Sequence, residues 1–357
     1  MNLRRGAACG LVAFVTLAAW APRGEAHKQG TSPYGFNDEV FPILRDRCGA
    51  CHVQGGVAPM SLLTYDDAVP WGESLRLELM AGHMPPWGAE SAVGRLRDSQ
   101  GLAARELNVL LTWASGETPL GDPAKTPGTL EPPRGWRLGP PDAEVPLPGV
   151  TLDADTQERT ETLTVATPFP DGAWLKAIDL RPGTPAIVRS ATVASGTGQL
   201  LARWQPGDVT VPLSDGHAFR LEAGEGLVVT IRYRKTWARE RMALTDRSAV
   251  GLYLTEGPAS AVQTLSIATA VTVLDAPVTL LAVSAGPVPP DGALRVTVTA
   301  PGGLPATLIA FQAKREWARR FWFDTPVMLA RGTRLEVAGP VGGGPAAQLL
   351  LDIVPTP

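Results

Sequence analysis

From about residue 149 onward, the sequence is a succession of short segments in which apolar and polar residues alternate, separated by Gly, Pro and Asp. Examples are TETLTVAT at 160–167, EGLVVTIRYR at 225–234 and ALRVTVTA at 293–300. Short strands with no helices between them predict antiparallel sheets packed as sandwiches. The region is large for one sandwich, so we predict two, at 149–257 and 258–357.

Residues 34–118 have a helical period instead. Apolar residues recur at helical spacing in three stretches, which predicts a small all-α domain. These stretches are 36–44, 71–81 and 102–113. Asn37 or Asp38 could cap the first, and Gly116 is a plausible end for the third. Between this zone and the strands, residues 119–148 hold nine prolines, which forbid a helix and predict an extended linker.

The first 26 residues have the order of a secretory signal peptide. Arg4 and Arg5 precede an apolar run from Gly6 to Trp20, and RGEA ends the segment at Ala26 with a small residue. The run is too short for a membrane-spanning helix, and no later stretch is long and apolar enough. We therefore expect an exported protein, periplasmic or extracellular, without a transmembrane segment after cleavage; an uncleaved anchor is the alternative.

Cysteine usage points to one site. Of the three cysteines, Cys9 leaves with the signal peptide, and Cys48 and Cys51 stand directly before His52 in CGACH. This C-x-x-C-H spacing is the attachment signature of a c-type haem, in which the thiols bind the two vinyl groups and the histidine becomes an axial iron ligand. A thioredoxin-like dithiol would need a βαβ context, and zinc would need further ligands. We expect one covalent haem c.

The haem iron needs a sixth ligand or an open site. Met84, in GHMPPW at 82–87, is the preferred candidate because two prolines stiffen its loop and thioether ligation suits electron transfer. Met60 and His83 are alternatives, and Met80 is a weaker one.

Several neighbouring residues are candidates for the haem pocket. The carbonyl of Pro59 could accept the second N–H of the axial histidine. Tyr65, Trp71 and Trp87 could line the pocket, or could be ordinary core residues.

Residues 36–121 resemble a bacterial cytochrome c domain. The matching segments are FNDEVFPILRDRCGACH, GGVAPMSLLTYDDAVPW, GHMPPW and ELNVLLTWASGETPLGDP. The second half is more loosely similar to copper type II, ascorbate-dependent monooxygenases, through segments such as WRLGPPD, AWLKAIDLRPG, ARWQPGD and DRSAVGLYL. That resemblance implies a pair of jelly-roll domains, each with one copper.

The copper ligands of that family are missing here. At the positions where the family has histidines for its first copper, this chain has Arg189, Ser190 and Arg232. From residue 120 onward His217 is the one histidine, whereas the two copper sites would need five. The resemblance therefore implies the fold and argues against bound copper and against catalysis.

These observations favour an exported monohaem cytochrome that passes electrons to unknown redox partner proteins, with a non-catalytic β-region for docking or scaffolding and no catalytic residues. One alternative is a haem-fed oxidoreductase with a second site made of carboxylates such as Asp208, Asp215 or Asp246. Another is a binding or sensor module, for which the Arg and aromatic residues of REWARRFWF (315–323) could be a docking patch or a cross-strand ladder. A formal net charge of −3 and the lack of a basic stripe exclude nucleic acid as an expected partner.

Overall fold

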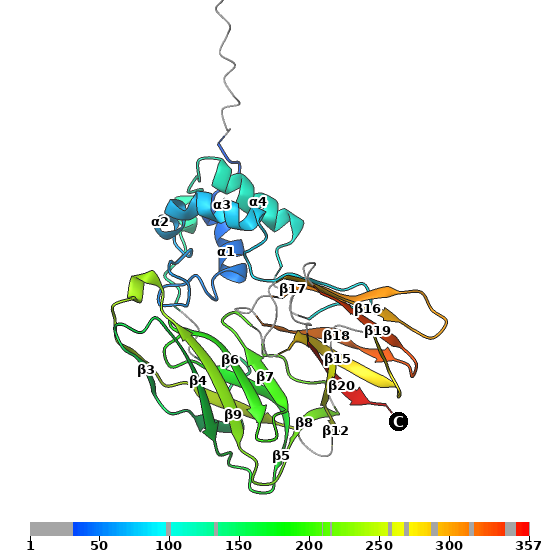
Figure 1. Cartoon of the computed structure of the whole chain (residues 1–357). Coiled ribbons are helices and arrows are strands. Elements are labelled where there is room, and N and C mark those ends of the chain that lie inside the picture. The colour runs from blue at the N-terminus through cyan, green and yellow to red at the C-terminus, as the bar shows by residue number, and fades with distance from the viewer. Residues whose placement is uncertain are drawn as a thin grey trace, which may run out of the picture.

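Figure 1 shows the computed structural model of the chain. The structure describes residues 31–97, 101–131, 135–208, 210–214, 216–255, 259–267, 271–286, 292–313, 318–339 and 348–356. The expected signal peptide lies outside the described residues. No helix of the described part is long and apolar enough to cross a membrane.

The expected fold class, a small all-α domain followed by two jelly-roll sandwiches, is wrong. The structure is mostly β, with 40% strand and 16% helix, and its larger sheets have a four-blade, propeller-like arrangement. The helices are short, and the segment expected to be all-α contributes a strand, β1 (Ala89–Glu90), to a β-sheet. The physical reason is local at first: α3 ends at Met80, Gly82 follows with φ 66°, and Pro85 and Pro86 cannot resume the helix, so an extended chain pairs with a sheet edge.

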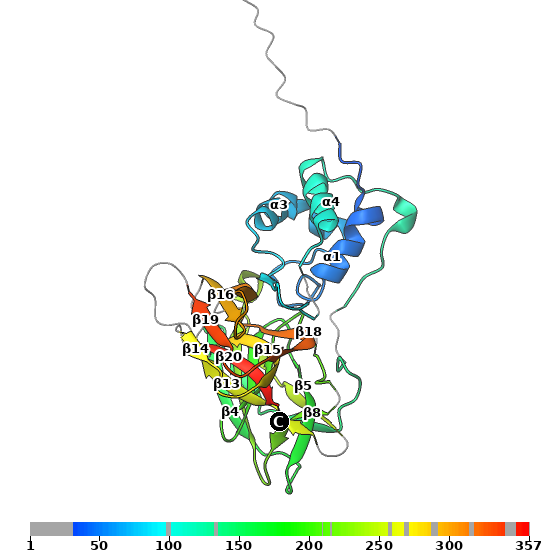
Figure 2. The same ribbon diagram turned by 90° about the vertical axis from the view of Figure 1, so that its right-hand side faces the viewer.

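The short helices lie together at one end of the molecule (Figures 1 and 2). They are the π-helix η1 (Phe36–Val40), α1 (Phe41–Arg47), α2 (Tyr65–Ala68), the 3-10 helix η2 (Val69–Trp71), α3 (Gly72–Met80), α4 (Ala104–Ser115) and the 3-10 helix η3 (Pro123–Lys125). The three predicted helical stretches are confirmed, and Gly116 does follow α4. Neither Asn37 nor Asp38 caps the first helix, because Gly35 is its N-cap and the Glu39 carboxylate accepts from the Gly35 N–H at 2.9 Å.

A buried core joins these helices. Phe36 and Trp113 are both fully buried, with ring centroids 5.9 Å apart, and Tyr65 stands edge-on to Phe36 at 5.7 Å. The indole N–H of Trp113 donates to the Pro119 carbonyl at 3.0 Å, so the start of the Pro-rich segment is fixed against the helices. This packing brings α1, α3 and α4 together around one core.

The first group of strands forms two sheets around a common core. One has the order β12-β8-β5-β11-β2, the other β4-β9-β6-β7, and a short β10-β3 pair lies beside them. The bounds are β2 Ala143–Pro146, β3 Val150–Leu152, β4 Glu158–Val165, β5 Ala173–Arg181, β6 Val188–Ser195, β7 Leu200–Trp204, β8 His217–Leu221, β9 Leu227–Arg234, β10 Leu244–Asp246, β11 Ala249–Leu254 and β12 Ser260–Ala261, with a 3-10 turn η4 at Trp237–Arg239.

The second group also places a core between two sheets, β1-β17-β16-β19-β14 and β13-β20-β15-β18. The bounds are β13 Gln263–Ile267, β14 Val271–Val273, β15 Val278–Ala285, β16 Gly292–Thr299, β17 Ala306–Ala313, β18 Arg320–Leu329, β19 Arg334–Ala338 and β20 Leu349–Pro355. A buried ion pair, Arg320 with Asp352 at 2.9 Å, lies where the two groups meet, because Arg320 also donates to the Leu201 carbonyl of β7 at 2.8 Å.

Two predicted boundaries shift in the structure. The segment 119–148, expected to be a linker, contains strand β2, which pairs with β11. The first group of strands extends past the expected break at 257, since β12 pairs with β8 and Val262 is buried in the first core. In both places a chain rich in Pro or Gly becomes ordered by pairing with a neighbouring strand.

Candidate functional site

A cavity of about 320 Å³ lies between the helices and the β-region. The CGACH residues, the loop that follows them, helix α3 and the Met84 loop form most of its wall. The β-region closes it with Arg189, Pro206, Gly207 and Arg319.

The CGACH turn begins at the residue that ends helix α1. Cys48 caps the helix, its N–H donating to the Leu44 carbonyl at 2.9 Å. The Cys48 carbonyl then accepts from the N–H of Cys51 at 3.1 Å and from the N–H of His52 at 2.9 Å. This tight turn brings both thiols and the imidazole to the wall of the same cavity. Both cysteines are free thiols.

The surroundings of both thiols favour the neutral form. Burial raises the pKa of Cys48 to about 12 and the pKa of Cys51 to about 11. At Cys51 the positive charges of Arg319, Arg189 and Arg137 oppose this rise. Since all three arginines precede or belong to the strands, the β-region supplies the electrostatic surroundings of the second thiol.

The surroundings of His52 favour its neutral form. Burial lowers its pKa, and the backbone of Met60 acts in the opposite direction as a hydrogen-bond acceptor. The buried Nδ1 atom nevertheless makes no hydrogen bond of standard geometry within the described part of the chain. The expected acceptor, Pro59, lines the cavity, and the acceptor beside the ring is the next residue along the chain.

The structure separates the candidates for the sixth ligand. Met84 and Met60 both line the cavity. His83 turns to the surface, where its Nδ1 lies 3.1 Å from the Glu78 carboxylate. Met80 is 65% exposed and its sulfur contacts the Arg76 guanidinium at 3.1 Å. Only the two methionines that line the cavity are brought to the same space as His52.

Two of the four predicted pocket residues line the cavity and two do not. Pro59 and Trp71 line the cavity. Tyr65 lies in the helical core, where its hydroxyl donates to the Thr118 carbonyl at 2.9 Å. Trp87 packs edge-on against Phe321 at 5.4 Å, in the core of the second strand group. The sequence gives no sign of this placement of Trp87, because it depends on the pairing of the adjacent strand β1 with the distant strand β17.

The positions where the resemblance expects copper ligands serve other contacts. Arg189 donates from Nη1 to the Val57 carbonyl at 2.7 Å and from Nε to the Arg234 carbonyl at 3.1 Å. Ser190 and Arg232 are register partners in β6 and β9, and Arg232 pairs with Glu158 at 2.6 Å. His217 contacts Ser214 at 3.2 Å.

The carboxylates considered for a second redox site do not come together. Asp208 pairs with Arg319, and Asp246 is 1% exposed and accepts hydrogen bonds from Ser248 and Thr184. Asp215 lies outside the described residues. In the part of the chain that the structure describes, no three His, Cys, Asp or Glu side chains gather as a metal-ion site.

Three of the residues that close the cavity from the β-region, Pro206, Gly207 and Arg319, were not among the predicted site residues, and the fourth, Arg189, was named only as a lost copper position. Arg319 belongs to the Arg- and aromatic-rich segment 315–323, which the sequence marks as unusual, but residues 315–317 lie outside the described part. Its side chain is 5% exposed, pairs with Asp208, and lies over the Trp87 ring at 5.7 Å. Pro206 and Gly207 form the turn after β7, where the Pro206 carbonyl lies 3.6 Å from the Cys51 sulfur.

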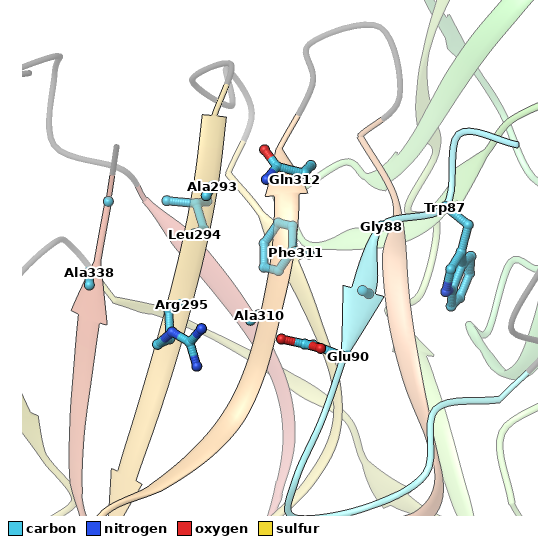
Figure 3. A pocket seen from close by; sticks show the side chains of 12 residues that line it. Trp87, Gly88, Glu90, Ala293, Leu294, Arg295, Ala310, Phe311, Gln312 and Ala338 are labelled. Carbon is cyan, nitrogen blue, oxygen red and sulfur yellow. The ribbon is translucent and has the colours of Figure 1, made fainter. Parts of the chain in front are cut away.

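A second cavity of about 550 Å³ lies on the outer sheet of the second strand group (Figure 3). Its floor consists of small residues, among them Ala310 of β17. Glu90 of β1 and Arg295 of β16 are register partners of Ala310 from either side, so opposite charges flank this floor. Trp87 lies at its edge, on the far side of β1 in the view, and belongs to this cavity instead of the one at CGACH.

The donor set of the first cavity fits a covalently bound haem. Two neutral thiols, one neutral imidazole and two thioethers line one mostly apolar space. These are the groups that attach and ligate haem c. No family model matches this chain, and no curated protein matches it.

Proposed function

We propose that this protein is an exported c-type haem protein that transfers electrons. The observation that carries the proposal is that Cys48, Cys51, His52 and Met84 line one cavity although a stretch of more than thirty residues separates the methionine from the others. A haem held there would supply one-electron redox chemistry.

The residues of the chain would divide the work. Cys48 and Cys51 would hold the haem covalently, each by adding its S–H across one vinyl double bond, with no atom lost and no net oxidation. His52 would supply an imidazole for the iron, whose neutral form burial favours. Met84 would supply a thioether, which favours ferrous iron, and Met60 is the alternative. The apolar wall excludes water, which limits the reorganisation that accompanies a change of charge.

The β-region would serve to enclose the haem site instead of carrying out catalysis. The support is the direct contact of Arg189 with the loop that follows CGACH, at a position where the resemblance expects a copper ligand. Copper is not part of the proposal. A haem-fed oxidoreductase and a gas sensor with an open sixth site remain the competing hypotheses.

The test is the metal and haem content of the full chain, made in a host with haem-attachment machinery and offered excess copper. We expect one covalent haem per chain in the wild type and none in the Cys48→Ala/Cys51→Ala variant. Met80→Ala is the matched control, because Met80 is exposed and lies outside the cavity. Wild-type protein without covalent haem would refute the proposal, and bound copper would favour the oxidoreductase.

A further inference from the structure

The β-region places a buried pair of charges beside the second haem-attachment cysteine. The Pro206 carbonyl lies 3.6 Å from the Cys51 sulfur, and Gly207 continues the cavity wall. The next residue, Asp208, forms an ion pair with Arg319, which also lines the cavity. One turn therefore carries both the contact to Cys51 and one member of the pair.

The guanidinium of Arg319 keeps one buried hydrogen-bond donor that Asp208 does not use. Its side chain is 5% exposed, while that of Asp208 is 18% exposed. The Arg319 Nε is buried and makes no hydrogen bond within the described residues, and the Trp87 ring covers the guanidinium at 5.7 Å. Buried polar groups without partners are costly, so an arginine retained here points to a task at the cavity.

Charges in such a place act strongly on a redox centre. Charge interactions are weakened little where water is excluded, and a ferric haem carries one more positive charge than a ferrous haem. A neighbouring cation therefore favours the ferrous form, and a neighbouring carboxylate opposes it, by the same logic that shifts a pKa.

We infer that the Arg319–Asp208 pair sets the reduction potential of the haem, so that the β-region is part of the redox centre. The inference rests on the proposed function, because it requires a haem at Cys48 and Cys51. Arg319 and Asp208 are positioning residues for the electron-transfer step: they set the balance between the two iron states without ligating the iron.

The test is a spectroelectrochemical titration of the full-length holoprotein. Asp208→Asn removes the compensating negative charge, so the ratio of ferrous to ferric haem at a fixed ambient potential should rise about tenfold, or about 59 mV for a one-electron couple. In the double variant Asp208→Asn/Arg319→Gln both charges are gone, and the potential should return close to that of the wild type. Glu336→Gln is the matched control, because it removes the same charge from an exposed pair with Arg334.

A second measurement needs no variant. If the turn at 206–208 lies against the haem edge, the amide resonance of Gly207 and the Nε–H resonance of Arg319 should shift between the ferric and ferrous wild-type protein, because ferric low-spin haem is paramagnetic. This keeps the inference testable even where Asp208→Asn does not fold.

The outcomes separate the two proposals. Covalent haem with equal potentials in Asp208→Asn and Glu336→Gln, or with Gly207 and Arg319 resonances that ignore the iron state, would overturn the inference alone. Wild-type protein without covalent haem would overturn the proposed function, and the inference with it. A shift in the single variant that the double variant reverses would support both.

Discussion

Replacing Arg189 with alanine should loosen the loop that follows His52. Arg189 reaches from β6 to the Val57 carbonyl at 2.7 Å, in a part-buried place. The loop from 53 to 62 is also held by backbone bonds, among them Ala58 N–H to the Cys51 carbonyl and Leu62 N–H to the His52 carbonyl, both at 3.1 Å, and by the buried side chains of Val53, Val57 and Leu62. Removing the guanidinium leaves Val57 without this donor.

The size of the effect follows from the nature of the bond. A hydrogen bond from a charged donor contributes about 1.5–3 kcal/mol to stability. Because about 1.4 kcal/mol corresponds to a tenfold change in an equilibrium constant, local opening of the loop should become about 10- to 100-fold more frequent. The second bond of Arg189, to Arg234, lies within the β-region and should not add to this local figure.

The assay is native-state amide hydrogen exchange in the full-length protein. Protection of the Ala58 and Leu62 amides should fall by that factor in Arg189→Ala, while the amides of α4 keep their protection. Arg232→Ala is the matched control, because Arg232 lies on neighbouring strand β9 and pairs with Glu158. Unchanged protection at Ala58 and Leu62 would refute the view that β6 holds the loop.

Three further predictions concern the axial ligand of the iron, the packing of the helical core, and the loss of stability at low pH. Met84→Ala should lower the haem potential and abolish methionine-ligation absorbance, whereas Met60→Ala should leave both close to wild type; the reverse pattern, read from optical spectra, would exchange the two assignments. Phe36→Ala, at a fully buried ring with three aromatic neighbours, should lower the free energy of unfolding of the helical part by about 3–5 kcal/mol in urea titrations, and a loss below 1 kcal/mol would contradict the packing described. The Lys125 ammonium lowers the pKa of Asp38, so this carboxylate stabilises the fold above its ordinary pKa of 3.8 and loses that contribution as pH falls through the lowered value. Asp38→Asn should therefore be less stable than wild type at neutral pH and equal to it in strong acid, and a difference independent of pH would argue against the ion pair.

The helices and the CGACH turn could be predicted because their signals are local. The apolar stripe at 102–113 predicted a helix where α4 lies. The C-x-x-C-H spacing predicted that Cys48, Cys51 and His52 act at one site, and all three line the same cavity. The loop with two prolines also directed attention to Met84, which does line the cavity.

The rest depended on contacts between distant parts of the chain. Trp87 looked like a pocket residue from its place after Met84, but β1 carries it into another core. Arg189 looked like the trace of a lost ligand, yet it holds the loop at Val57. The all-α expectation failed for the same reason: a two-residue strand has no period, and β1 is placed by its pairing with Phe311 and Ala310 of the distant strand β17.

The pairing of Ala89 with Phe311 also dictates an order of assembly. Helix α1 and the CGACH turn depend on backbone contacts within a few residues, so they can form early in folding. The Met84 loop is followed by β1, and β1 is placed by its pairing with β17, more than two hundred residues further along the chain. Contacts between such distant residues form late. The cysteine side of the cavity can therefore form early in folding, whereas the methionine side becomes fixed only when the sheet that contains β17 has formed.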